Sequence, residues 1–270
     1  MKFVLFRHGH SLANQESRIV SSLENGTRTD GGPEGTGFGL SSKGRLEVAE
    51  TSKSLAEHII ASSSPSKSPS GHRTRVRILT SPFQRTLHTS AIIQSQLLAA
   101  FSHHLNNNTT TATTTTNATT HITLQSNLEV TPDLRERYFG DFEMRTPSDD
   151  LYNKVWSEDA NNPFHQMYGV ESVMDVTQRV SGVIRNLEQE GGGGSAGGEA
   201  EGSGEEKKEE EGEEWVILVS HGDSLQILQT AMKGWSGDRH RQLEHLETAN
   251  WRVVEWCPDL RSAHDRRHRR

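Results

Sequence analysis

The sequence predicts an α/β protein in which a mostly parallel sheet is covered by helices on both faces. Three observations support this prediction. Short continuous apolar runs, typical of buried strands, lie at residues 2–6 and 216–219. Segments with helical periodicity alternate with the predicted strands along the chain. Each apolar run is followed by the same pattern, a histidine and then a glycine, with His8 after the first run and His221 after the second.

The first predicted strand is followed by a helix and then by a second strand. Ser41 is a suitable N-cap, and the helix is expected to run to about residue 60. The expected apolar face of this helix consists of Leu46, Ala49, Ala56 and Ile59. Residues 75–80 form the second strand.

Another helix is predicted to open at Ser81-Pro82, because proline is favoured at the first helical position. Its apolar residues at helical intervals are Leu87, Ala91 and Leu98. A short helix is expected at residues 149–157.

Ser172 and Asp175 have the spacing of a capping box, which predicts that a further helix begins there. The apolar stripe of this helix is Val173, Val176, Val180, Ile184 and Leu187. The last strand is expected at residues 251–256. Because strand crossovers are right-handed, the loops after residues 6, 80 and 219 should lie at one edge of the sheet.

The composition indicates one domain with insertions. Only 31% of the 270 residues are hydrophobic, and the deficit lies in segments rich in Ser and Pro, Asn and Thr, or Gly and Glu. Such segments bury too little apolar surface to offset the entropy of ordering. We therefore expect a single domain over residues 1–257, with low-complexity insertions at 62–75, 102–122 and 189–214, and a basic disordered tail at 258–270.

Charge and cysteine content exclude several classes of protein. Residues 199–214 hold nine glutamates and two lysines, which accounts for the whole net charge of −7. The five arginines of the tail are the only indication of nucleic-acid binding, and they lack interleaved aromatic residues. Cys257 is the one cysteine, so neither an internal disulfide nor a zinc site built of cysteines is expected. Arg7 interrupts the first apolar run, so no membrane span or secretion signal is expected, and the predicted location is cytoplasmic.

The residues at the predicted sheet edge suit a phosphoryl group. Arg7, His8, Arg85 and His221 would meet there, because each follows or adjoins the end of a strand. Arginine binds phosphate through paired, charge-assisted hydrogen bonds. A neutral histidine is a nucleophile toward phosphorus at neutral pH. This chemistry requires no metal and no cofactor, and no metal-ligand pattern occurs.

Protonation of the leaving alkoxide requires an acid, and two glutamates are candidates. Glu136 and Glu143 lie in the segment that follows the second strand. A carboxyl group can act as acid near neutral pH when its pKa is raised. The residues alone leave the choice between the two open.

Taken in order along the chain, these motifs resemble the histidine phosphatase superfamily, in its phosphoglycerate-mutase-like branch. The motifs are Arg7-His8-Gly9 with Ser11 and Asn14, Ser81-Pro82 with Arg85, Leu134 with Glu136 and Gly140, Gly169-Val170-Glu171-Ser172, and Ser220-His221-Gly222. Each is weak alone, but the ordered set is specific.

The resemblance implies a three-layer α/β/α sandwich and a covalent phosphohistidine on His8. It implies that Arg7, Arg85 and His221 bind the phosphate, that Asn14 lies near the rim of the pocket, and that His221 is also catalytic. It selects Glu136 as the general acid and base and leaves Glu143 a structural role. His10 departs from the family pattern and is interpreted as a surface residue.

The segment at 143–171 separates two activities within this family. It holds six acidic residues but only two basic ones, Arg145 and Lys154. A net-negative lid disfavours a bisphosphate. The prediction is therefore a phosphomonoesterase of the histidine acid phosphatase kind, acting on a small phosphate ester, with no membrane partner. The alternative is a phosphoglycerate mutase, and the lesser alternative is an inactive relative that binds phosphorylated ligands. The oligomeric state stays open.

Overall fold

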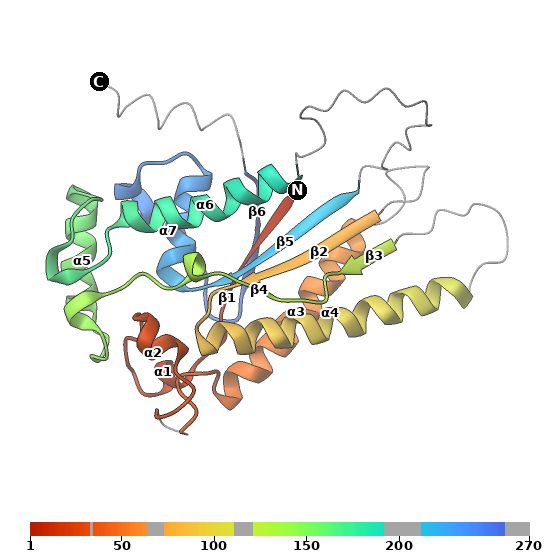
Figure 1. Ribbon diagram of the computed structural model, residues 1–270, viewed down its shortest axis with the longest axis horizontal. Helices are drawn as coiled ribbons and strands as arrows, with labels where there is room; N and C mark the ends of the chain where they lie inside the picture. Colours follow the sequence, from red (N-terminus) through yellow and green to blue (C-terminus); the bar gives the residue numbers. More distant parts are fainter. Residues whose placement is uncertain (33–34, 64–72, 111–120, 192–211, 257–270) are drawn as a thin grey trace, which may run out of the picture.

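A six-stranded sheet lies at the centre of the computed structural model, which describes residues 1–32, 35–63, 73–110, 121–191 and 212–256 (Figure 1). The strand order is β3-β2-β5-β1-β6, and the short β4 pairs with β2. The strands are β1 (Lys2–Arg7), β2 (Arg73–Thr80), β3 (His121–Leu124), β4 (Glu129–Val130), β5 (Glu213–Ser220) and β6 (Trp251–Val254).

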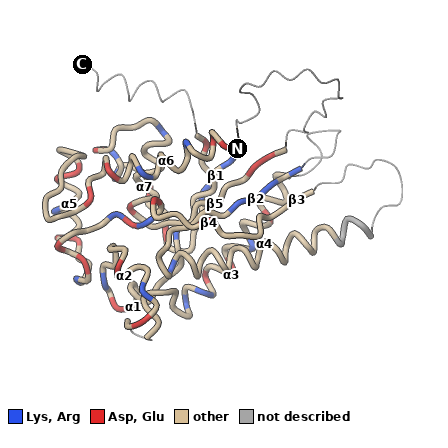
Figure 2. The backbone as a smooth tube through the Cα atoms, in the orientation of Figure 1, with Lys and Arg blue, Asp and Glu red and all other residues tan. Residues whose placement is uncertain are grey.

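The sheet is mostly parallel, as predicted. β5 pairs in parallel with both β1 and β2, whereas β6 is antiparallel to β1. At the edge where these strands begin, basic residues of β2 lie beside acidic residues of β5 (Figure 2). Nη1 of Arg77 lies 3.7 Å from the Glu214 carboxylate across this pair. Charge complementarity therefore supports the strand register at the edge opposite the predicted site.

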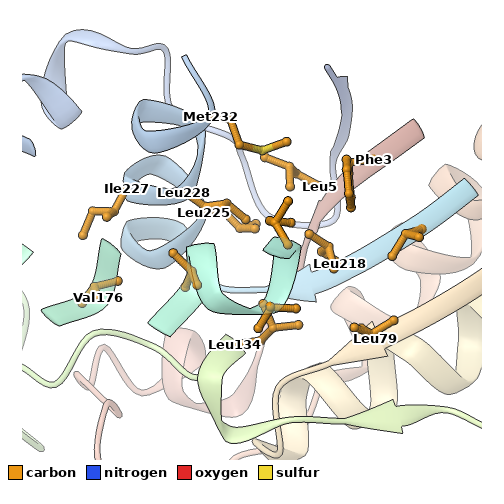
Figure 3. Packing of buried hydrophobic residues seen from close by; sticks show 14 of the residues in the cluster. Phe3, Leu5, Leu79, Leu134, Val176, Leu218, Leu225, Ile227, Leu228 and Met232 are labelled. Atoms are coloured by element: carbon orange, nitrogen blue, oxygen red, sulfur yellow. The ribbon is translucent and has the colours of Figure 1, made fainter. Parts of the chain in front are cut away.

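Two pairs of helices complete a three-layer α/β/α sandwich (Figure 1). α3 (Ser42–Ser62) and α4 (Gln84–Thr110) cover one face, and α6 (Val173–Gly191) and α7 (Gly222–Met232) cover the other. Alternate residues of β1 point to opposite faces. Val4 packs into the core on the α3 and α4 side, whereas Phe3 and Leu5 pack with α6 and α7 (Figure 3).

Shorter elements gather at the carboxyl ends of the parallel strands (Figure 1). They are the helices α1 (Leu12–Gln15), α2 (Leu23–Thr27) and α5 (Asp149–Asn161), and the 3-10 turns η2 (Pro132–Leu134), η3 (Gly140–Phe142), η4 (Met167–Gly169) and η5 (Gly237–Gln242). Across the described part of the chain, none of the helices combines the length and apolar character needed to span a membrane.

The predicted capping box at the start of α6 is confirmed. The Asp175 backbone N–H donates to Ser172 Oγ at 3.0 Å, and the Ser172 N–H donates back to the Asp175 carboxylate at 3.3 Å. The whole predicted stripe of this helix is buried against β1 and β5. Ser41 likewise caps α3 through the Gly44 N–H.

The predicted apolar faces of the two other long helices were partly wrong. On α3, Leu46 is exposed and the buried face instead includes Val48 and Leu55. On α4, Leu98 is half exposed, and Ile93 and Leu97 are buried in its place. Ala91 is also exposed. α4 has apolar residues on more than one side, so local periodicity does not choose a face. Packing against α3 and the sheet selects one.

The predicted boundaries of all three insertions need correction, since Ser62 belongs to α3, β2 begins at Arg73 and β5 begins at Glu213. α4 continues to Thr110, inside the segment predicted as an insertion at 102–122, because helix propagation tolerates polar residues there. β3 starts at His121 and α6 reaches Gly191, so these residues belong to regular elements as well. Other parts of the predicted insertions, and all of Cys257 and the tail at 258–270, lie outside the described residues.

Candidate active site

Three neighbouring strands end at one point of the sheet edge, and their following residues face one another. The register pairs Arg7 of β1 with Ser220 of β5, so that His8 and His221 come next on adjacent strands. The His8 N–H donates to the Ser220 carbonyl at 3.0 Å. From β2, the Ser81 N–H donates to the Val219 carbonyl at 3.1 Å. The parallel register therefore brings together segments that are far apart in sequence.

Arg85 joins the two histidines. It lies in the first turn of α4, and its Nε is 3.1 Å from His8 Nε2 and 3.2 Å from His221 Nδ1. The two imidazole rings are 5.1 Å apart, edge to face. All three side chains are buried. The sequence prediction that these residues meet is confirmed by their positions.

The hydrogen bonds of His8 determine which ring nitrogen carries the proton. Nδ1 lies 2.8 Å from the Gly9 carbonyl, which only accepts, so Nδ1 holds the hydrogen. Nε2 is therefore the unprotonated nitrogen, and it accepts from Arg85 Nε at 3.1 Å. Burial first, and then the charges of Arg85 and Arg7, hold the pKa of His8 well below 6.5. The ring is neutral at physiological pH.

His221 has the opposite tautomer. Nδ1 accepts from Arg85, so Nε2 carries the hydrogen and donates to Ser81 Oγ at 2.8 Å. The Phe83 ring packs edge to face against the imidazole at 4.9 Å. Burial and the charge of Arg85 also hold the pKa of His221 well below 6.5. Ser81, Phe83 and Arg85, which follow the end of β2 and lead into α4, thus fix this ring.

Arg7 is held at the pocket by residues that no sequence motif indicated. Its Nη1 donates to His245 Nε2 at 2.5 Å and to the Leu246 carbonyl at 2.9 Å. Gly222 makes room for the guanidinium, because a Cβ there would lie 3.2 Å from Arg7 Cζ. Burial, only partly offset by Glu136 and Glu247, lowers the pKa of Arg7.

Two guanidinium nitrogens at this site are buried without a hydrogen-bond partner among the described residues: Arg7 Nε and Arg85 Nη1. A buried, unsatisfied N–H of a charged group is costly, which favours a ligand that can accept from it. The Arg85 guanidinium contacts His8 Nε2 through Nε, and the charge of Arg7 also acts on the His8 ring. The pocket is therefore suited to an oxyanion whose central atom approaches His8 Nε2.

Glu136 lies half-buried near this pocket. Its Oε1 accepts from the Arg137 N–H at 3.0 Å and from both the N–H and Oγ of Ser224 at 3.2 Å. Burial, and then the charge of Asp223, raise the pKa of Glu136 above its ordinary value, against the opposing effect of Arg85. The carboxyl group therefore keeps its proton to higher pH than an exposed glutamate does.

Glu143 has a different environment. Its carboxylate accepts from the backbone and hydroxyl groups of Ser21 and Ser22, and from the Asn25 amide. Although burial opposes it, these hydrogen bonds lower the pKa of Glu143. The ionised carboxylate ties α2 to the segment that follows η3. These contacts match the structural role predicted for it.

Asn14 has no hydrogen bond to His8, Arg85 or His221 among the described residues. It lies on the exposed side of α1, and its Oδ1 accepts from the backbone N–H of Ser11 at 3.0 Å, which completes a capping box. His10 was interpreted as a surface residue, but it is half-buried and its Nδ1 lies 2.8 Å from Ser41 Oγ. Both residues serve local structure in the contacts described.

A buried ionic cluster supports the segment that carries Glu136. The fully buried Arg137 donates two bonds of 2.7 Å to Asp159 of α5, and one of 3.2 Å to Asp223 of α7. His165 Nε2 lies 2.7 Å from the same Asp159 carboxylate. The cluster joins the Glu136 segment to two helices that are remote in sequence.

The sequence did not indicate His245 or the Arg137 cluster. None lies in a strand-end motif, and the spacing of each from the predicted residues is arbitrary. Ser81 lies in a predicted motif and Ser224 follows another, but their hydrogen bonds to His221 and Glu136 depend on how α4 and α7 pack.

Comparison with known proteins agrees with this description. A family model described as histidine phosphatase superfamily (branch 1) matches residues 109–196, a range that includes Glu136 but not His8, Arg85 or His221. No curated protein matches the chain. A mycobacterial glucosyl-3-phosphoglycerate phosphatase solved with VO3 is 18% identical, with a TM-score of 0.57, over 97% of this chain and 94% of that one. The alpha-ribazole phosphatase from Shigella flexneri is 17% identical, with a TM-score of 0.56, over 96% and 92%. These similarities establish the fold.

Proposed function

We propose that this chain, which matches the histidine phosphatase superfamily (branch 1) model over residues 109–196, is a metal-independent phosphomonoesterase of that superfamily whose catalytic domain spans residues 1–257. The observation that carries the proposal is the buried, neutral His8, acted on by two guanidinium groups with unpaired N–H donors. This set provides a nucleophile and a receptor for the phosphoryl oxygens, and it is built from side chains alone.

The proposed reaction has two steps. His8 Nε2 forms a bond to phosphorus, the ester P–O bond breaks, and Glu136 gives its proton to the leaving alkoxide. The Glu136 carboxylate then takes a proton from water, the water oxygen attacks phosphorus, and the N–P bond breaks to release phosphate. Arg7, Arg85 and His221 stabilise the charge on the peripheral oxygens in both steps. Asn14 is proposed to contact the substrate at the rim.

The test is release of phosphate from p-nitrophenyl phosphate in excess EDTA. We expect release at a rate unchanged by the chelator, because the proposed chemistry uses no metal. Loss of activity in EDTA that added metal restores would contradict the metal-independent mechanism. Absence of release would contradict a general phosphomonoesterase.

A phosphoglycerate mutase is the alternative to be tested beside it. A mutase retains a bisphosphate, which the acidic segment at 143–171 disfavours. Turnover of 3-phosphoglycerate that depends on 2,3-bisphosphoglycerate and exceeds phosphate release would establish the mutase instead.

Replacing Glu136 with glutamine is expected to discriminate between leaving groups. Alkyl phosphates need a proton on the departing oxygen, so their kcat/KM should fall about 10²–10⁴-fold. Nitrophenyl phosphate has a stable leaving group and should lose far less. In the wild type, alkyl phosphate turnover should decline as pH rises through the elevated pKa of Glu136, because the acid form is lost.

Glu143→Gln is the matched control for this substitution. It removes a carboxylate that accepts from Ser21 and Ser22 but has no proposed role in chemistry. We expect Glu143→Gln to lower thermal stability and to affect both substrates equally. Equal losses on both substrates in Glu136→Gln would contradict its role as the acid.

His245 is expected to position Arg7, and its removal should raise KM more than it lowers kcat. A hydrogen bond to a charged group contributes about 1.5–3 kcal/mol, so His245→Ala should raise KM roughly tenfold or more. His245→Gln provides an amide oxygen as acceptor and should restore most of the affinity. Steady-state kinetics on nitrophenyl phosphate measures both constants.

The wild type should also lose affinity in acid. Arg7, Arg241, Glu247 and Asp223 act on the His245 ring, and burial followed by Arg7 lowers its pKa. The ring is neutral above that pKa. As pH falls through it, the ring gains a proton, no longer accepts from Arg7, and KM rises. His245→Gln cannot titrate, so the same acid-side rise in this variant would contradict the positioning role.

A further inference from the structure

An aromatic stack lies on the side of the site that carries Glu136. The Phe139 ring meets Tyr152 of α5 edge to face at 5.5 Å, and Tyr152 stacks on Trp156 at 4.9 Å with 9° between the planes. Arg241 of η5 completes the stack, with its Cζ 3.7 Å from the centre of the Trp156 ring. Neighbours on both sides therefore hold the Tyr152 ring in place.

The stack ends on the residues that surround Glu136. Phe139 lies three positions after Glu136, and Arg241 Nη1 is 3.5 Å from the carboxylate of Asp223, which precedes the Ser224 that binds Glu136. The Tyr152 hydroxyl interacts electrostatically with Glu136 and Asp223, and more weakly with Arg7 and Arg85. The charges of the proposed acid and of the phosphate-binding arginines therefore both act on the phenol, whose ring packs against Phe139 of the Glu136 segment.

The phenol is a neutral hydrogen-bonding group at every physiological pH. Burial, followed by the charges of Glu136 and Asp223, raises the pKa of Tyr152 to about 12. The described residues provide no hydrogen-bond partner for its hydroxyl, although the ring itself is tightly packed. A half-buried ring whose hydroxyl has no hydrogen-bond partner among the described residues, packed against the segment of the proposed acid, is suited to contact the group that departs.

The guanidinium groups beside this aromatic stack are already paired. Arg241 contacts Asp223, Gln226 and Trp156, and Arg137 is paired with Asp159 and Asp223. The unpaired donors, Arg7 Nε and Arg85 Nη1, belong to guanidinium groups whose charges act on His8, and they are taken by the phosphoryl group in the proposed function. α5 adds acidic residues at its start and near its end, with Lys154 as its one basic residue (Figure 2).

We propose that Tyr152 contacts the leaving group through its hydroxyl, and that the substrates are phosphate monoesters of uncharged, hydroxyl-bearing alcohols. This inference rests on the proposed phosphomonoesterase function. A second phosphate or a carboxylate on the leaving group would meet the negative charges of Glu136 and Asp223, and the neighbouring guanidinium groups of Arg137 and Arg241 are already paired. A hydroxyl there can accept from the phenol or donate to it.

Two substrates with the same carbon skeleton test the inference. Glycerol 3-phosphate and 3-phosphoglycerate differ only where a hydroxymethyl group replaces a carboxylate. We expect the wild type to have a kcat/KM at least about tenfold higher for glycerol 3-phosphate. Tyr152→Phe removes one hydrogen bond and should lower that value about tenfold, while nitrophenyl phosphate, which has no hydroxyl, changes less than about threefold.

Tyr138→Phe is the matched control, because Tyr138 is exposed and belongs to no part of the proposed site. It should leave all three substrates unchanged. Three results would overturn the inference and leave the proposed phosphomonoesterase function intact. They are turnover of 3-phosphoglycerate equal to or better than that of glycerol 3-phosphate, equal losses on all substrates in Tyr152→Phe, and turnover of nitrophenyl phosphate but of neither three-carbon ester. Failure of the wild type to hydrolyse nitrophenyl phosphate would overturn both.

Discussion

Replacing His8 with alanine is expected to abolish turnover of every phosphate ester, by about 10⁴-fold or more. The proposed phosphoenzyme requires a lone pair at the position of His8 Nε2. We expect no substitution by His221, because its ring is held by Arg85 and by Ser81 and its proposed role is to stabilise the phosphoryl oxygens. Phosphate release from nitrophenyl phosphate measures the loss.

Trapping the intermediate provides a second measurement. Labelled phosphate should appear on the wild type as an acid-labile adduct and should be absent from His8→Ala. His58→Ala is the matched control, since His58 lies on the exposed side of α3 beside Trp215 and should retain activity. Turnover by His8→Ala within about tenfold of the wild type would exclude the phosphohistidine mechanism.

Replacing Asp159 with alanine is expected to cause the largest loss of stability. Asp159 and Arg137 are both completely buried and share two short hydrogen bonds. Removing one partner of a buried ion pair leaves the other charge uncompensated, which costs about 3–5 kcal/mol. For a protein of this size the melting temperature should fall by roughly 6–20 °C.

Asp150→Ala is the control for this variant, because Asp150 is an exposed acidic residue in the first turn of the same helix. Its loss should cost less than about 1 kcal/mol. Thermal unfolding followed by circular dichroism compares the two. If Asp159→Ala were as stable as Asp150→Ala, the cluster would not be what joins α5 to the Glu136 segment.

Much of the fold follows from local sequence. The apolar runs before His8 and His221 predicted β1 and β5, and the Ser172 capping box predicted where α6 begins. Parallel pairing then implied that Arg85 would lie near both histidines, because strand ends and helix starts share one edge. These predictions succeeded since each depends on periodicity or on contacts within a few residues.

Other features depended on how the elements pack. The same apolar content suits two faces of α4, and contact with α3 and the sheet buries Ile93 and Leu97 rather than Leu98. Sequence alone left Glu136 and Glu143 equivalent, whereas their environments differ: the pKa of Glu136 is raised by burial and Asp223, and that of Glu143 is lowered by Ser21 and its neighbours.

By itself, therefore, the sequence determined an α/β protein with a histidine at each of two neighbouring strand ends and an arginine close to both. Only the tertiary structure decided which ring nitrogen of His8 is unprotonated, that His245 holds Arg7, and that Tyr152 packs against Phe139 of the Glu136 segment. The physical reason is the distance along the chain over which each kind of interaction acts. Strand and helix signals act over a few residues, whereas protonation states and side-chain partners are set by groups that only the packing of remote segments brings within hydrogen-bonding distance.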